Sequence, residues 1–480
     1  MFSMKKTYFI ASLLMFFTGC AVGPKYVRPT TQIPAAYKES KDWKKAQPQD
    51  EIIRGEWWKI FNDPRLDALE EQVNISNQNI VAAQAQYAQA YALVQAAKSA
   101  IFPILTTTGS YTRSHGGSSG NNGSSGSNGG SSSSSHYAVS NNLLSADVTW
   151  EVDLWGKIRQ TITSYKAQAQ ASSADLENAK LSAQAQLAQD YFQLCSLDAQ
   201  KKLLDDTIII YQKFLDLTKN QYASGVVSES AVIQAKTQLE ATQAQEIDIG
   251  VQRSQMEHAI ALLIGKPASD FSIPSLSLPS RVPDVPTGLP SEILERRPDI
   301  AAAERTVASA NALIGVAEAA YYPTLTLSAS GSYGSSDLSR IFSSPNPLWS
   351  VGPALAETIF DAGLRQAQTS QAKAVYDQDV ASYRQTVLTA FQQVEDNLAA
   401  LRILEQEEQV QDAAVKDAQK ALELEINQYK AGTVSALDVI TIQATALTNE
   451  KTDVTLLGER FNVCVLLIQY LGGGWTTSQE

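Results

Sequence analysis

The sequence has few of the residues on which enzymes and disulfide-rich proteins depend. Its 480 residues include three histidines and three cysteines. No catalytic triad, metal-ligand spacing or phosphate-binding loop stands out, so we expect no enzyme, cofactor or metal. A metal site at His115 and His136, which flank a Gly/Ser-rich run, is the alternative. Cys195 and Cys464 lie far apart in helical patterns, which favours two buried thiols over a disulfide.

Basic runs and aromatic residues are also sparse. The formal net charge is -12, and no block of lysine and arginine interrupts the sequence. This excludes a nucleic-acid surface and a polybasic membrane helix. Apolar residues make up 44% and aromatic residues 8%, which is little for one thick core in a chain of this length.

The N-terminus carries a short apolar run. It reads MFSMKKTYFIASLLMFFTGCAVGP, with two lysines, an apolar stretch and then Thr-Gly-Cys. A run of about ten residues suits a secretory signal and falls short of the roughly 20 needed to cross a bilayer. The residues before Cys20 resemble a lipoprotein cleavage site, so we expect residues 1–19 to be removed and Cys20 to carry diacylglycerol and a fatty acyl group. Ala21 favours the outer membrane, and an ordinary signal peptide with an incidental Cys20 is the alternative.

The sequence contains an internal repeat. The matched pairs, in the same order in both halves, are 96–114 with 316–336, 151–159 with 357–365, and 221–228 with 428–435. In the first pair, Phe102-Pro103 stands against Tyr322-Pro323. The offset then falls from 220 to 206, so the first half has 14 extra residues, and that gap holds the Gly/Ser/Asn-rich run 116–135.

The repeat sets the expected domain organisation. The expected segments are an extended N-terminal region 20–60, a first repeat 61–270, a proline-rich linker 271–290, a second repeat 291–471 and a tail 472–480. Each repeat is expected to hold a leading helix, a β-hairpin (103–155 or 323–360) and coiled-coil helices.

A strict alternation follows the Gly/Ser-rich run. Apolar and polar residues alternate over eleven residues, which is typical of a membrane strand with one face to lipid and one to water. The lipid-facing candidates are Leu144, Val148, Trp150, Val152 and Leu154. Weaker patterns predict strands at 104–112, 324–333 and 350–360. Four strands cannot close a membrane barrel, so the chain must oligomerise; two soluble hairpins on helical domains are the alternative.

Long helices are predicted between the strands. Residues 156–221 contain no proline and carry a coiled-coil seam, and if continuous they reach about 100 Å. Residues 363–428 are their counterpart. Glycine-containing turns lead to return helices at 230–264 and 436–470. One leading helix is expected from Asp63-Pro64 to just before Pro103.

Several motifs resemble those of outer membrane factors of the NodT/OprM type, which are TolC-like. They are GCAVGPKYVRP, EWWKIFNDPRLDAL, ILERRPDIAAAE, YYPTLTLSASGSY, IFDAG and YKAGTVSALDVI. The resemblance implies an α+β membrane protein: a homotrimer with a shared 12-stranded outer-membrane β-barrel and a periplasmic α-barrel of long antiparallel helices. It also implies a Gram-negative outer membrane, a periplasmic adaptor (membrane fusion) protein and an inner-membrane RND-type pump as partners. Residues 116–135 would then form an extracellular loop, as inert filler or as a site of surface variation.

The resemblance further implies a gate at the helix turns. Tyr429 and Gly432 match the family's Tyr-x-x-Gly motif, and Asp438 falls on a position used for a gate carboxylate. Three copies would form an acidic ring that holds cations. Thr441 stands where relatives often have a second Asp. The alternative for Asp438 is a solvated carboxylate in the first turn of a helix.

Two further sets of residues follow from the same motifs. Tyr222 and Gly225 form the corresponding tip of the first repeat, and we expect Tyr222 and Tyr429 to serve in packing. Arg296, Arg297, Pro298 and Asp299 form a structural motif at a helix start.

The function implied by the resemblance is an exit duct for small molecules in a tripartite efflux pump. One alternative is the outer-membrane channel of type I protein secretion. An alternative of another class is a coiled-coil surface lipoprotein that acts as a scaffold or adhesin.

Overall fold

The computed structural model describes residues 22–31, 33–34, 37–39, 55–115, 138–285, 296–341 and 348–473. The signal segment 1–19, Cys20, the run 116–135, His136 and the end of the tail lie outside the described residues. The chain divides into two compact units. The strand unit comprises Met1–Arg28, Ala90–Ala169 and Val307–Asp379, and the helical unit comprises Pro29–Gln89, Gln170–Thr306 and Val380–Glu480.

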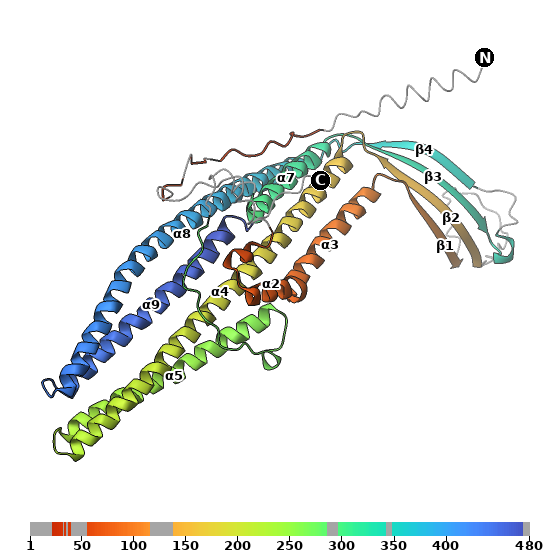
Figure 1. Cartoon of the computed structure of the whole chain (residues 1–480). Helices are drawn as coiled ribbons and strands as arrows, with labels where there is room; N and C mark the ends of the chain where they lie inside the picture. Colours follow the sequence, from red (N-terminus) through yellow and green to blue (C-terminus); the bar gives the residue numbers. More distant parts are fainter. Residues whose placement is uncertain are drawn as a thin grey trace, which may run out of the picture. The chain divides into compact units, whose positions relative to one another are not determined.

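The strand unit contains one four-stranded antiparallel sheet in the order β1-β2-β3-β4 (Figure 1). The strands are β1 (Ile104–His115), β2 (Ala138–Val152), β3 (Thr324–Ser335) and β4 (Leu348–Ala356). All four lie where the sequence predicted strands.

Two strands end earlier than expected, because an aspartate after each strand caps the start of the following helix. Asp153 accepts hydrogen bonds from the backbone N–H groups of Ile158 (3.1 Å) and Arg159 (2.9 Å). This turn ends β2 at Val152, so the prediction that Leu154 belongs to the strand was wrong. Asp361 likewise accepts from the N–H groups of residues 363 and 365, and β4 stops at residue 356 instead of 360.

Most of the helices are long. They are α2 (Pro64–Ser76), α3 (Gln78–Ser99), α4 (Lys157–Ala223), α5 (Glu229–Leu263), α7 (Pro298–Ala319), α8 (Leu364–Lys430) and α9 (Ala436–Tyr470), with 3-10 turns η2 (Trp57–Phe61), η3 (Ala268–Asp270) and η4 (Leu338–Arg340). The predicted long helices and their return helices are confirmed. Within the described part of the chain, no helix has an apolar stretch suited to crossing a membrane.

The expected single leading helix is instead two helices, α2 and α3. Asn77 has extended backbone (ψ 120°), and its Oδ1 accepts hydrogen bonds from the N–H groups of Asn79 and Ile80. Its Nδ2 donates to the carbonyl of Leu263 at 2.8 Å. An asparagine side chain competes with helical hydrogen bonds in this way, so the prediction of continuity was wrong at this residue.

An aromatic cluster anchors α2 in the helical unit. Phe61 lies 4.7 Å from Phe192 and 6.2 Å from Phe461, between ring centroids, and Phe192 and Phe461 stack at 4.6 Å. Asp63 caps α2, as predicted, by accepting from the N–H groups of Arg65 and Leu66. The cluster therefore joins the chain before α2 to α4 and α9.

Candidate functional site

The register gives the sheet one apolar and one polar face. One row across the four strands is entirely apolar: Leu105, Val148, Ala329 and Val351. The adjacent row points to the opposite face and is entirely polar: Thr106, Asp147, Ser330 and Ser350. Because opposite residues in an antiparallel ladder share a face, the alternation of each strand is in phase with that of its neighbours. Such a sheet fits lipid on one side and water on the other.

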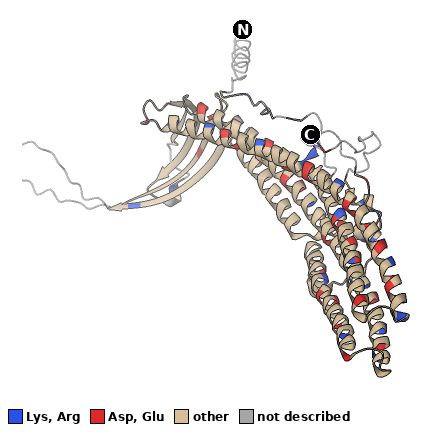
Figure 2. Cartoon of the chain, turned by 90° about the vertical axis from the view of Figure 1, so that its left-hand side faces the viewer, with Lys and Arg blue, Asp and Glu red and all other residues tan. Residues whose placement is uncertain are grey.

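The predicted lipid-facing residues lie on the apolar face, apart from Leu154. Leu144, Val148, Trp150 and Val152 are opposite Tyr333, Ala329, Leu327 and Leu325 of β3. Their contact with lipid stays a prediction. Figure 2 shows few charged residues on the strands and many along the helices.

The weak pattern of β4 continues the same apolar face. On β4, Trp349, Val351 and Leu355 are 77%, 73% and 70% exposed, and the register places them on the apolar side. Sequence reasoning missed them because Gly352 and Pro353 interrupt the pattern; pairing with β3 provides the missing information.

Both outer strands have an unpaired edge. Within the described sheet, β1 pairs with β2 alone and β4 pairs with β3 alone. An open edge of this kind is a template for pairing with another chain. The sheet can therefore extend by pairing beside β1 and beside β4.

The two helix turns of the repeats have the same backbone geometry. Gly225 and Gly432 adopt φ values of 76° and 75°, which favour glycine. Each glycine N–H donates to the tyrosine carbonyl three residues earlier, Tyr222 or Tyr429, at 2.9 and 3.0 Å. The N–H of the next residue donates to the carbonyl five residues earlier, which closes a Schellman-type helix end.

Tyr429 lies in a core shared by four helices. The described members are Tyr211, Phe214, Leu215, Ala235, Leu239, Tyr429, Ala436, Val439 and Ile440. Tyr429 is 4% exposed, and its hydroxyl donates to Oε1 of Gln221 at 2.5 Å and lies 3.4 Å from Oγ1 of Thr218. Tyr222 is 47% exposed. The two tyrosines thus differ: Tyr429 ties α8 to α4, whereas Tyr222 faces solvent in the single chain.

Asp438 is part of a capping box at the start of α9. Its Oδ2 accepts from the N–H of Ser435 at 2.9 Å and from the Ser435 hydroxyl at 2.6 Å, while the Asp438 N–H donates back to that hydroxyl. The hydrogen bond from the Ser435 hydroxyl lowers the pKa of Asp438, so this exposed carboxyl is charged. Thr441 is exposed and donates to the carbonyl of Leu437. The capping role fits the first-turn interpretation, and the gate role stays a prediction.

The Arg-Pro-Asp motif joins two helix ends. The guanidinium of Arg297 donates to both carboxylate oxygens of Asp299, at 3.0 and 2.5 Å, and to the carbonyl of Tyr470 at 3.3 Å. Arg297 is 7% exposed. Pro298 begins α7, and a Cβ on Gly472 would lie 2.4 Å from the carbonyl oxygen of Arg296. The motif therefore fixes the start of α7 against the end of α9.

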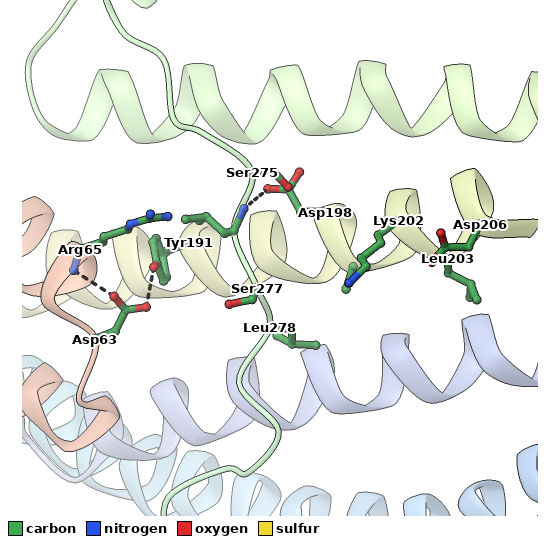
Figure 3. Close-up of a pocket in the computed structure, with 12 residues that line it drawn as sticks. Asp63, Arg65, Tyr191, Asp198, Lys202, Leu203, Asp206, Ser275, Ser277 and Leu278 are labelled. Atoms are coloured by element: carbon green, nitrogen blue, oxygen red, sulfur yellow. Dashed lines mark hydrogen bonds between the residues drawn. The ribbon is translucent and has the colours of Figure 1, made fainter.

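Figure 3 shows a polar pocket beside α4 in the helical unit. Two of its acidic residues, Asp63 and Asp198, already have partners. Asp63 accepts from the Tyr191 hydroxyl at 2.5 Å, and Asp198 accepts from Arg253 at 2.7 Å and from the N–H of Leu276 at 2.8 Å. The pocket thus holds the segment after α5 against α4. Among the described residues, no group of three potential metal ligands comes together.

The comparisons with known proteins agree with this architecture. The family model "Outer membrane efflux protein" matches residues 69–266 and 289–473. The chain is 29% identical to the probable efflux pump outer membrane protein TtgC of Pseudomonas putida, over 95% of this chain and 93% of TtgC. It is 30% identical to the pyoverdine export outer membrane protein OpmQ of Pseudomonas aeruginosa, over 88% of each.

Solved structures agree as well. The outer-membrane channel OprN is 29% identical, with a TM-score of 0.85 over 95% of this chain and all of OprN. The Campylobacter jejuni outer membrane channel CmeC has the same fold, with a TM-score of 0.86 at 23% identity, over 96% of each chain. The family match covers most of the chain, and the fold is shared along nearly its full length. The chain therefore belongs to the outer membrane efflux protein family, as its motifs predicted, and has the TolC-like fold.

Proposed function

We propose that this protein is the outer-membrane exit duct of a tripartite efflux pump and conducts small molecules passively to the exterior. The observation that carries the proposal is the four-stranded sheet with one apolar face, one polar face and two unpaired edges. Such a sheet suits the wall of a water-filled passage in a membrane. Energy for transport would come from the pump.

Three copies form the duct. Four strands per chain give twelve in a closed barrel, which removes every open edge. The helices support the same assembly, because α8 has large apolar side chains on its exposed surface: Leu388, Ile403, Val410 and Leu424. Neighbouring copies would cover them, since exposed apolar surface in water is costly.

A lipid anchor at Cys20 is the second part of the proposal, with residues 1–19 removed as a signal peptide. The N–H of Val22 donates to the carbonyl of Trp155 at 3.0 Å, and Asn311 donates to the carbonyl of Pro24 at 3.1 Å. Trp155 follows the end of β2 by three residues. Val22, two residues after the proposed anchor, is therefore held at this end of the sheet.

The helix turns form the gate of the duct. The Tyr429 hydroxyl links the α8–α9 turn to α4 through Gln221, and three Asp438 carboxylates would place negative charge at the constriction. Opening would separate the turns and break this link. A periplasmic adaptor and an RND-type inner-membrane pump are the partners that would drive it.

Small-molecule efflux is preferred over protein secretion because of the relatives' described roles. TtgC is described as a probable efflux pump component and OpmQ as a pyoverdine exporter. Type I secretion uses the same kind of duct and stays the second candidate. A scaffold or adhesin is less favoured, because it would not need a sheet with one apolar and one polar face.

The test is dye efflux from preloaded cells that lack other exit channels. We expect slower efflux of a fluorescent cationic dye without this gene, and recovery when the intact gene is returned. Unchanged efflux with the protein in the outer membrane would contradict the proposal for such substrates. Loss of a secreted protein would then favour type I secretion, and a purified protein without channel conductance would favour the scaffold.

A further inference from the structure

The junction that follows β2 is covered by the residues that precede β3. The indole ring of Trp155 stacks on Tyr322, with centroids 4.7 Å apart and ring planes at 24°. Its Nε1 donates to the carbonyl of Pro323 at 2.8 Å. This contact covers the end of the β2–β3 pair at which β2 ends and β3 begins, where Val152 is opposite Leu325.

The junction that follows β4 has no comparable cover in the single chain. Ile359 and Phe360 are each 85% exposed, the largest exposed fractions among the large hydrophobic side chains of the described residues. They stand between a strand end and a helix start, as Leu154 and Trp155 do in the first repeat. Large apolar side chains that stay in water forgo the free energy that burial would provide.

The residues before β1 correspond to those before β3, but they are left exposed in the single chain. The sequence repeat aligns Phe102-Pro103 with Tyr322-Pro323, the residues that receive Trp155. Phe102 is 67% exposed and Ile101 is 43% exposed. β1 and β4 are the two strands with open edges. The exposed pair Ile359 and Phe360 after β4 and the exposed residues before β1 therefore lie at opposite edges of one sheet.

Strand direction brings these surfaces together between copies. Each adjacent pair in the sheet is antiparallel, and a closed barrel continues that pattern from β4 to β1 of the next copy. The end of β4 then lies beside the start of β1. We propose that Ile359 and Phe360 of one copy pack on Phe102 and Pro103 of the next copy, at the place between copies that corresponds to the Trp155–Tyr322 contact within the chain.

This inference rests on the proposed trimer and adds a defined contact to it. The repeat aligns Trp155 with Asp361 and Leu154 with Phe360, so the junction after β4 has no indole N–H that could donate to a proline carbonyl as Trp155 does. The contact between copies is therefore apolar, and it should hold the copies together by burial and ring packing alone.

Cysteine cross-linking of the full-length protein tests the contact. In the double variant Phe360→Cys/Phe102→Cys, mild oxidation should give covalent dimers and trimers on heated, non-reducing gels. Each single variant should give none, and neither should the control Phe360→Cys/Tyr111→Cys, because Tyr111 lies on β1 nine residues after Phe102. The native Cys195 and Cys464 are buried and do not compete. Ile359→Cys/Ile101→Cys provides a second pair if the first variant does not assemble.

The outcomes separate this contact from the duct itself. Cross-linking by either pair, with a silent control, supports the contact. A conducting trimer that neither pair cross-links overturns the contact and leaves the exit duct standing. A wild-type protein that is monomeric and does not conduct overturns both.

Discussion

The hydroxyl of Tyr429 offers the sharpest test of the gate. It donates to Gln221 at 2.5 Å and joins the α8–α9 turn to α4. Tyr429→Phe removes this hydroxyl and keeps the ring in its core, where the centroid lies 5.2 Å from that of Phe214. If opening breaks the link, the variant weakens the closed state selectively.

The size of the effect follows from the burial of the partners. A hydrogen bond contributes about 0.5 to 1.5 kcal/mol net. Gln221 is only partly buried, so water can replace the lost donor, and we expect about 1 kcal/mol per chain. Three turns that move together give about 3 kcal/mol, a shift on the order of 100-fold in the ratio of closed to open channels. If the three turns move independently, the ratio of closed to open states of each turn shifts about fivefold.

Single-channel recording of the purified protein in planar bilayers measures this ratio. The matched control is Tyr222→Phe, the first-repeat counterpart, which is 47% exposed and should change the open fraction by less than about twofold. A Tyr429→Phe channel that opens as rarely as the wild type, with an intact trimer, would refute the reasoning.

Three other predictions concern charge and burial. Asp438→Asn keeps an acceptor for Ser435 but removes the charge, so an acidic ring predicts higher conductance and weaker block by divalent cations; unchanged block in bilayer recordings would leave Asp438 a cap only. Glu70 is 0% exposed and its carboxylate oxygens have no hydrogen-bond partner among the described residues, and burial, with Asp67, raises its pKa well above the usual range. The folded state then binds this proton more tightly than the unfolded state, so the free energy of unfolding falls as pH rises from about 4.3 through the folded pKa. Glu70→Gln should therefore raise Tm more at pH 8 than at pH 5. Equal increases in Tm at the two pH values would contradict a raised pKa for Glu70. Arg297→Ala strips the donors from Asp299 and Tyr470 and should cost about 3 kcal/mol, seen as a lower Tm, with Arg297→Lys intermediate; a Tm within error of the wild type would show that the pair is dispensable.

The sequence alone predicted most of the elements, because their causes are local. Proline-free, alanine-rich stretches predicted the long helices, and alternation over 144–154 predicted the strand β2, which spans Ala138–Val152. The repeated Tyr-x-x-Gly turns were visible because a left-handed residue after a helix calls for glycine at that position. Asp63 and Pro64 marked a helix start for the same kind of reason.

The tertiary structure decided what depends on partners far apart in the sequence. Asn77 breaks a helical pattern because its side chain caps α3 and reaches the carbonyl of Leu263. Pairing with β3 placed the irregular β4 on the apolar face, and the fold gave Tyr429 a partner 208 residues away. Composition and periodicity report the neighbours along the chain, whereas register, buried hydrogen bonds and open edges depend on which segments the fold brings side by side.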